Sequence, residues 1–435
     1  MAYHTSTDIV GSNPACLEDP EKDGDFALSE TRAPQPVCAD PSQRQLWDTA
    51  ELPAEATAPA TTPAPITTSP SRSPTVSLSK HATQFYTISY LILFALLGTL
   101  ARLGLQALTY YSGAPVVTGV LWANVTGCLI MGFLVEDKNL FREEWGARPP
   151  SPPPPKHSAE AATLAKNHKA VKKTIPLYIG LTTGFCGCCT SFSSFMRDVF
   201  LALANALPDP SLPAGTAIAS RNGGHSFMAL VAIIILTVSL SLSALLVGAH
   251  LALGLARFTP TVPFAFTRRV VDPFVAALAW GCWLGAVFLA IWPPDRGADR
   301  ETWRGRAVFA LVFAPLGCLL RFFVSLRWNA RVPAFPLGTF AVNVFGTLIE
   351  GMCYDLQHVA GLGGLVGCQV LQGVMDGFCG STTTVSTWVA ELNGLSRRRH
   401  AYVYGGVSVG VGLAVLVVVM GSLLWTRGFA DPVCG

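Results

Sequence analysis

GFCGCCTSFSSF at residues 184–195 returns later in the chain as GFCGSTTTVSTW at residues 377–388. Two further motifs precede each copy in the same order, one containing an arginine and one containing an asparagine. They are GTLARLGLQAL (98–108) and LWANVTGCLIMGF (121–133) in the first half, and APLGCLLRFFVSL (314–326) and FAVNVFGTLIEGM (340–352) in the second. Self-similarity at a regular offset marks an internal repeat. The sequence therefore consists of two related halves.

The spacing between equivalent residues is nearly constant. Arg102 and Arg321 are 219 residues apart, and the asparagines of the second motif have the same separation, whereas Gly184 and Gly377 are 193 residues apart. The difference matches an extra polar segment at 138–174, which contains PPSPPPPK and several lysines. One insertion in the first half therefore accounts for the change of offset.

Composition places both halves in a membrane. Of 435 residues, charged types make up 13% and AVILMFWYC 51%, and the mean hydropathy is +0.43. Soluble domains carry about 25% charge, so an ordinary soluble enzyme is excluded, and a net charge of +3 gives no reason to expect a nucleic-acid partner. Nine stretches approach the ~20 apolar residues that cross a bilayer. They are 85–110, 117–136, 175–205, 226–256, 270–292, 307–328, 336–356, 364–393 and 402–425.

These spans predict an all-α polytopic protein whose two four-helix repeats are joined by one linking helix. A single extra crossing makes the second repeat start from the opposite face, so the repeats are expected to be inverted about a pseudo-two-fold axis in the membrane plane. The expected segments are a disordered tail (1–83), the first repeat (84–256), a linker with the fifth span (257–306), the second repeat (307–426) and a C-terminal tail (427–435).

Lysine and arginine are concentrated in the even-numbered connections between spans. Because cytoplasmic loops carry the excess of these residues, we expect a cytoplasmic N-terminus and an extracellular C-terminus.

The repeated polar residues suggest what the membrane domain does. Asn124 and Asn343 lie in mid-span, where a side-chain amide either joins two helices or lines a polar path; their recurrence favours the path. Arg102 and Arg321 lie toward the ends of their spans, as snorkelling anchors or as vestibule groups that attract anions. We find no acidic residue at matching membrane positions in both halves, which disfavours a proton relay and favours a small anion.

The segments 184–195 and 377–388 are rich in Gly, Cys, Ser and Thr. Such clusters permit close helix packing or a broken helix whose free carbonyls face an ion. Phe192 and Phe195 share one helix face, and the positive edge of an aromatic ring could line an anion path.

The doubled motif G-F-C-G-x-x-T-[ST]-[FV]-S-[ST]-[FW], with preceding Asn-x-x-Gly and Leu-x-Arg helices, resembles the fluoride channel family (Fluc, formerly CrcB). The fused organisation is similar to that of the eukaryotic fluoride exporters. The resemblance implies two fluoride paths beside the pseudo-axis and a structural Na⁺ between backbone carbonyls. Carried over to this sequence, it assigns the following residues: the Na⁺ carbonyls to Gly187, Thr190, Gly380 and Thr383, the pore asparagines to Asn124 and Asn343, the vestibule arginines to Arg102 and Arg321, and the phenylalanine pair to Phe192 and Phe195.

The two halves depart from the family pattern in different ways. Val385 and Trp388 stand where the first half has its phenylalanines. Tyr404 and Ser408 keep the fourth-helix polar track, although Gly412 in the last place lacks a hydroxyl. Thr384 and, in the first half, Ser241 complete the expected pore lining. We therefore expect one working pore, beside Asn343 and Tyr404.

The resulting prediction is a plasma-membrane channel, not an enzyme, that works as a single chain in the lipid bilayer and exports fluoride passively down its electrochemical gradient, which protects the cell from fluoride. The alternatives are a coupled fluoride/proton transporter on the same fold, and a non-transporting scaffold that signals through its tail.

Overall fold

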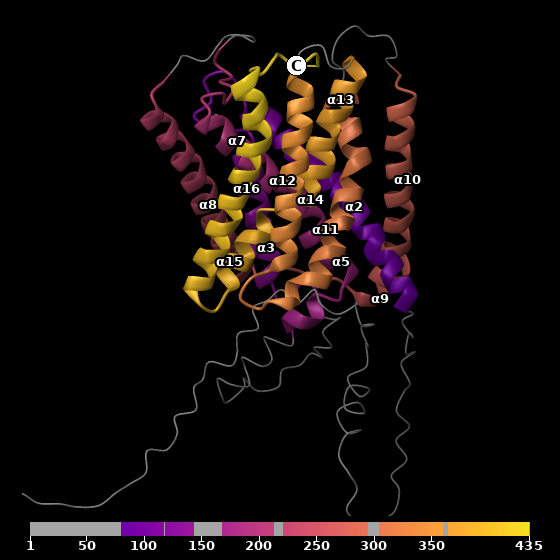
Figure 1. The fold of residues 1–435 in the computed structure, drawn as a ribbon. Coiled ribbons are helices and arrows are strands. Elements are labelled where there is room, and N and C mark those ends of the chain that lie inside the picture. Colours follow the sequence, from indigo (N-terminus) through magenta and orange to yellow (C-terminus); the bar gives the residue numbers. More distant parts are fainter. Residues whose placement is uncertain are drawn as a thin grey trace, which may run out of the picture.

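A computed structural model of the chain describes residues 80–116, 118–142, 168–212, 221–294, 304–359 and 364–434. The predicted tail up to residue 79, the centre of the 138–174 segment and the connection at 295–303 lie outside the described residues. Every regular element in the described part is helical, and the helices run side by side in one bundle (Figure 1).

The first half contributes four helices to the bundle, and the third of them is interrupted. Its elements are α2 (Lys80–Thr109), α3 (Val120–Glu136), α5 (Pro176–Ile179), η1 (Gly180–Cys186), α6 (Gly187–Cys189), α7 (Phe192–Leu203) and α8 (Gly223–Gly254). The third of these helices is formed by α5, η1 and α6, which stack end to end, and by α7 after a break.

The second half repeats this order. Its elements are η3 (Arg304–Val308), α11 (Phe309–Trp328), η4 (Asn329–Arg331), α12 (Leu337–His358), α13 (Leu365–Gly373), η5 (Val374–Cys379), α14 (Gly380–Thr382), α15 (Ser386–Gly394) and α16 (Arg398–Thr426). The break between α14 and α15 corresponds to the one between α6 and α7.

Between the halves lies a linking helix, composed of α9 (Phe264–Phe266), η2 (Thr267–Val271) and α10 (Asp272–Ile291). It stands at the edge of the bundle beside α2 (Figure 1). The hydroxyl of Tyr90 donates to Asp272 Oδ1 at 3.0 Å, and Trp283 Nε1 donates to the Val312 carbonyl at 3.0 Å. The linker is thus joined to the first helix of each half.

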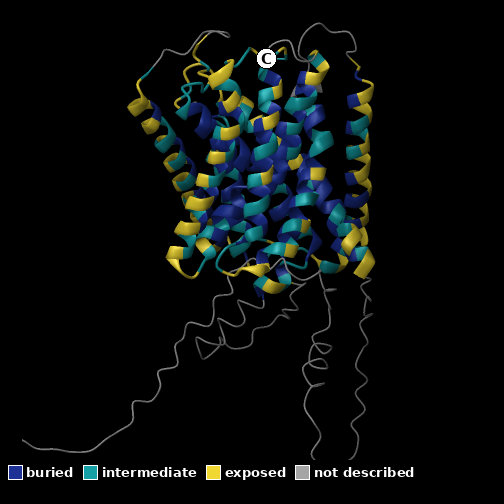
Figure 2. Ribbon diagram, in the orientation of Figure 1, coloured by how far each residue is buried: buried dark blue, intermediate teal, exposed yellow. Residues whose placement is uncertain are grey.

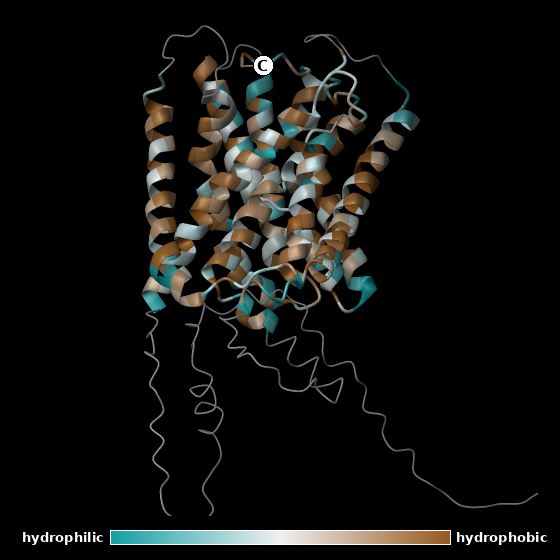
Figure 3. Cartoon of the chain, turned by 180° about the vertical axis from the view of Figure 1, so that it is seen from behind, coloured by the Kyte–Doolittle hydropathy of each residue, from teal (hydrophilic) through white to brown (hydrophobic). Residues whose placement is uncertain are grey.

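The outer surface of the bundle is apolar. Large side chains such as Leu236 and Leu246 on α8 and Phe274 and Phe288 on α10 are exposed, and Figures 2 and 3 show exposed, hydrophobic ribbon on the peripheral helices. Within the described part of the chain, five helices are long and apolar enough to cross a membrane: Lys80–Thr109, Gly223–Gly254, Phe264–Ile291, Phe309–Arg331 and Arg398–Thr426. An exposed apolar surface of this extent is unfavourable in water and favourable in contact with lipid. The chain is a multi-pass membrane protein.

A lysine outside the bundle caps α3. Lys172 Nζ donates to the carbonyls of Leu134 at 2.7 Å and Asp137 at 2.5 Å, so its charge meets the negative end of the helix dipole. Burial lowers the pKa of Lys172 to about 8 and that of His168 to about 4. The described end of the 138–174 segment is therefore packed against the domain.

A disulfide joins Cys368, near the start of α13, to Cys434 near the C-terminus. The amide of Ala430 also donates to the carbonyl of His358 at 2.9 Å. This pair could not be predicted, because nothing in the sequence indicates that the last residues return to α13.

Candidate functional site

The third helix of each half is interrupted at the same position of the motif. After α6 the backbone becomes extended at Thr190 (φ −93°, ψ 150°), and after α14 it becomes extended at Thr383 (φ −93°, ψ 155°). Of the two structures that the Gly, Ser and Thr clusters permit, the broken helix is therefore present in both halves.

Each break is held by the repeated asparagine. The amide of Ser191 donates to Asn124 Oδ1 at 2.9 Å, and the amide of Thr384 donates to Asn343 Oδ1 at 2.9 Å. In a continuous helix these two amides would bond the carbonyls four residues earlier. Those carbonyls, of Gly187 and Gly380, are thereby released from helical bonding.

Hydroxyl groups release two more carbonyls in the same way. The amide of Ser194 donates to Ser191 Oγ at 3.2 Å, and the amide of Thr387 approaches Thr384 Oγ1 at 3.4 Å. The helical acceptors of these amides would have been the carbonyls of Thr190 and Thr383. The four released oxygens belong to the four residues that the family resemblance assigned to Na⁺.

The two breaks lock into one another through their threonines. Thr383 Oγ1 accepts from the amides of Phe192 at 3.1 Å and Ser193 at 3.0 Å. Thr190 Oγ1 accepts from the equivalent amides of the other half, Val385 at 3.2 Å and Ser386 at 3.1 Å. Reciprocal contact of this kind, in which i meets j and j meets i, defines a two-fold relation.

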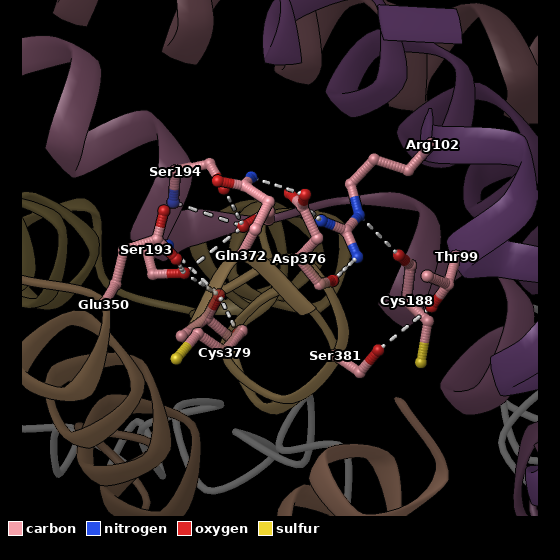
Figure 4. A network of polar contacts seen from close by, with 12 residues as sticks. Thr99, Arg102, Cys188, Ser193, Ser194, Glu350, Gln372, Asp376, Cys379 and Ser381 are labelled. Carbon is pink, nitrogen blue, oxygen red and sulfur yellow. Dashed lines mark hydrogen bonds and ion pairs between the residues drawn. The ribbon is translucent and has the colours of Figure 1, made fainter. Parts of the chain in front are cut away.

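The buried arginines obey the same relation, and Figure 4 shows the contacts of Arg102. Arg102 Nε donates to the Cys188 carbonyl at 3.1 Å, and its Nη2 donates to the Asp376 carbonyl. Arg321 Nε donates to the Ser381 carbonyl at 2.9 Å, and its Nη2 donates to the Thr183 carbonyl at 2.7 Å. Each guanidinium thus bonds the broken helix of its own half and that of the other half.

This position differs from the expectation that Arg102 and Arg321 line vestibules. Their exposures are 0% and 2%, and both guanidinium groups are bonded to protein. At each break the amides of Phe192 and Val385 bond threonine hydroxyls, which frees the Cys188 and Ser381 carbonyls to accept from the arginine Nε donors. A Cβ at Gly187 would overlap the Arg321 guanidinium, and a Cβ at Gly380 would overlap that of Arg102. A side chain at either position would therefore have to displace a guanidinium that two backbone carbonyls hold.

The predicted pore residues of the second half lie on two neighbouring helices, α12 and α16. Asn343 and Thr347 lie one turn apart on α12, and the Thr347 hydroxyl donates to the Asn343 carbonyl at 2.7 Å. On α16, Tyr404 and Ser408 are buried. A Cβ at the next position of that track, Gly412, would lie 3.4 Å from Phe192 Cε1. The α16 track of the second half therefore lies against an aromatic ring of the first half.

The remaining predicted residues are also buried. The rings of Phe192 and Phe195 meet edge to face with centroids 5.8 Å apart, and Trp388 meets Phe192 in the same way at 5.3 Å. Ser241 on α8 is fully buried. The hydroxyl of Thr384 lies 3.2 Å from that of Thr190, at the contact between the two breaks.

The two asparagines differ in their second contact. Asn343 Nδ2 donates to the Thr384 carbonyl at 3.2 Å. Asn124 Nδ2 is buried and has no hydrogen-bond partner among the described residues. The two sides of the site are thus unequal.

The statement that no acidic residue recurs in the membrane is wrong. Asp198 and Glu391 are 193 residues apart, the offset of the motif itself, and both are buried. Glu391 accepts from the Tyr404 hydroxyl at 2.7 Å and from Thr339 Oγ1 at 2.7 Å. Applying the offset to acidic residues beyond the quoted motif would have found this pair.

A third buried acidic residue, Glu350, has no equivalent in the other half and was not among the predicted site residues. It is fully buried, accepts from Ser193 Oγ at 2.8 Å and pairs with Arg197 at 2.9 Å. Among the described residues no group of three or more His, Cys, Asp or Glu side chains could hold a metal ion.

Taken together, these features define a multi-pass helical membrane protein whose two related halves lock around a buried, hydrogen-bonding centre. The chain belongs to the family described as "CrcB-like protein, Camphor Resistance (CrcB)", whose model matches residues 89–249 and 308–422.

Named relatives extend over most of the chain. It is 58% identical over 371 residues to fluoride export protein 1 of Neurospora crassa, which covers 82% of this chain and 70% of the relative. It is 33% identical over 359 residues to fluoride export protein 1 of Candida albicans (81% and 83%). A bacterial relative, the fluoride-specific ion channel FluC of Chromobacterium violaceum, is 32% identical over 117 residues, which are 26% of this chain and 87% of the relative. No solved structure matches the chain significantly.

Proposed function

We propose that this protein is a fluoride channel that exports fluoride from the cytosol and so protects the cell from it. The observation that carries the proposal is the 58% identity to a protein named for fluoride export, over 82% of this chain. The buried centre supports it, because amides, hydroxyls and aromatic edges are suited to compensate a small anion that has shed its water. Export is passive, since a negative-inside potential drives each anion outward by ~2.3 kcal/mol per 100 mV. The proposed activity is conduction and not catalysis.

The decisive experiment is fluoride efflux from liposomes that contain the purified protein. Fluoride should leave at channel rates and chloride should not. Liposomes that lose both anions, or neither, would overturn the proposal.

A coupled fluoride/proton transporter is the second candidate, because Asp198 and Glu391 are buried at matching positions. An imposed pH gradient separates the two functions. It should leave fluoride efflux at constant membrane potential unchanged for a channel, and it should drive fluoride uphill for a transporter.

For the architecture, we propose nine spans, with the four-helix units 84–256 and 307–426 inverted about an axis in the membrane plane. The reciprocal contacts of Thr190 and Thr383 support a two-fold relation between the units. The bacterial FluC relative supports the division, because about a quarter of this chain covers nearly all of that channel. One chain would then contain both units of a functional pair without a second copy.

For the orientation, we propose a plasma-membrane protein with a cytoplasmic N-terminus and an extracellular C-terminus. The Cys368–Cys434 disulfide supports this, since disulfides form and persist on the oxidising side of a membrane.

Labelling of intact cells tests the orientation. A membrane-impermeant reductant followed by an impermeant maleimide should label Cys368 and Cys434. A Cys434→Ser control should leave Cys368 as the single reactive partner. Labelling that requires permeabilised cells would reverse the orientation.

We also propose that a structural Na⁺ binds the released carbonyls of Gly187, Thr190, Gly380 and Thr383. Carbonyls of unwound helices coordinate Na⁺ in transporters, and the four oxygens here have lost their helical amides to side chains. When bound, the ion would supply positive charge that holds the two breaks together.

Sodium removal should therefore destabilise the purified protein. A ligand at a hundredfold its dissociation constant stabilises the folded state by about 2.7 kcal/mol, so Tm should rise with added NaCl. N-methylglucamine chloride of equal ionic strength is the control. Equal Tm in both salts would exclude the Na⁺ site without affecting the proposed fluoride conduction.

A further inference from the structure

A charged pair is present on one side of the site and has no counterpart on the other. Arg197 Nη1 lies 2.9 Å from Glu350 Oε1, and Arg197 Nη2 lies 3.7 Å from Asp198 Oδ1. At the equivalent positions of the other half, Met131 stands in place of Glu350 and Ala390 stands in place of Arg197. The pair therefore distinguishes one path from the other.

The carboxylate end of this pair reaches the centre of the site. Ser193 Oγ donates to Glu350 Oε2 at 2.8 Å and accepts from Thr383 Oγ1 at 3.1 Å. Without a carboxylate on its side, the equivalent Ser386 Oγ donates instead to the Cys186 carbonyl at 3.1 Å. The hydroxyl network thus continues outward to Glu350 on one side alone.

Glu350 also lies on the face of α12 that carries the proposed path. Asn343, Thr347 and Glu350 have the i, i+4, i+7 spacing of one helix face. The first half has Asn124, Cys128 and Met131 at the equivalent positions. Polar groups therefore extend farther along the second-half path than along the other.

The guanidinium end of the pair reaches an open cavity. Arg197 has 19% of its side chain exposed and lines a cavity of about 540 Å³ at the end of the bundle that carries the C-terminus. Asp198, Gln357, Gln372 and Asp376 are among the other lining residues. Asp376 is itself paired with the buried Arg102 at 3.9 Å, so Glu350 and Asp198 are left to neutralise Arg197.

We propose that Arg197 is the outer fluoride-binding site of the conducting path, and that Glu350 is a positioning residue that keeps fluoride binding at this site weak. The inference rests on the proposed fluoride conduction. A guanidinium has five N–H donors, and Glu350 and Asp198 occupy two of its nitrogens, which leaves donors for a departing anion. A lone buried guanidinium would hold fluoride too tightly, because conduction requires sites weak enough to leave. The buried carboxylate cancels most of that attraction.

Glu350→Gln tests the proposal, since it keeps the shape and the acceptor for Ser193 while removing the charge. In planar bilayers the half-saturating fluoride concentration on the cavity side should fall about tenfold, which corresponds to about 1.4 kcal/mol, and the maximal current should fall with it. The double variant Glu350→Gln/Arg197→Gln should restore weak binding. Met131→Gln, the same side chain at the equivalent position of the other half, should change neither quantity.

The outcomes separate this inference from the proposed function. A wild-type protein without fluoride current contradicts the function itself. If the wild type conducts and Glu350→Gln leaves the half-saturating fluoride concentration unchanged, the proposed role of the pair is wrong. It is also wrong if the double variant still binds fluoride tightly. If Glu350→Gln does not elute as a monodisperse protein, Asp198→Asn removes the other counter-charge and should shift half-saturation in the same direction; no shift would equally overturn the proposal.

Discussion

Asn343→Asp is expected to reduce fluoride efflux at least about a hundredfold. The new carboxylate keeps the oxygen that accepts from the Thr384 amide, and this bond favours its ionised form. It replaces the Nδ2 donor by a negative charge beside the path of an anion. Two unit charges 4 Å apart interact by about 4 kcal/mol at an effective dielectric constant of about 20. Added to the barrier for fluoride, an energy of this size slows permeation by far more than tenfold. Efflux from proteoliposomes measures the effect.

Asn124→Asp is the matched control. The same chemical change is made at a residue with the same contact, since Asn124 Oδ1 accepts from the Ser191 amide. Because we place conduction on the second-half path, this variant should retain efflux. Efflux that survives Asn343→Asp and is abolished by Asn124→Asp would move conduction to the other side. Loss in both variants, with both proteins folded, would contradict a single working path.

The second-half path is favoured by what α12 carries. Thr347 and Glu350 continue the polar face that starts at Asn343, whereas Cys128 and Met131 continue the face of Asn124. Gly412, which lacks the hydroxyl expected in the polar track, lies against Phe192. The missing hydroxyl therefore leaves room for an aromatic ring of the other half, so the proposed path would combine both units.

The repeated motif indicated the helix breaks as one of two possible structures, because clustered Gly, Ser and Thr are a local property of the sequence. It also identified Asn124 and Asn343, although not what they do. Their oxygens divert the amides of Ser191 and Thr384, and this contact joins two helices that the sequence shows only separately.

The surroundings of Arg102 could not be predicted for the same reason. Hydropathy places an arginine along its own helix, but the Asp376 carbonyl that it bonds belongs to the other half. The roles of Arg197 and Glu350 were not predicted, because a search for repeats finds residues that the halves share. These two residues have no equivalents in the other half. That these two residues of different helices form a pair is therefore visible only in three dimensions.

Replacing Thr383 by Val is expected to lower the free energy of unfolding by about 2–6 kcal/mol, because a buried amide that loses its acceptor costs about 1–3 kcal/mol. The methyl group fills the space of the hydroxyl, while the amides of Phe192 and Ser193 are left without a partner. Thr190→Val removes the acceptor of the two equivalent amides and should cost a similar amount, as measured by thermal unfolding in detergent. Thr382→Val is the control, since its buried hydroxyl has no hydrogen-bond partner among the described residues and its removal should cost little. A large loss of stability in Thr383→Val with none in Thr190→Val would show that the halves are held together from one side. The two-fold relation would then hold for the backbone geometry and not for the energies of the contacts.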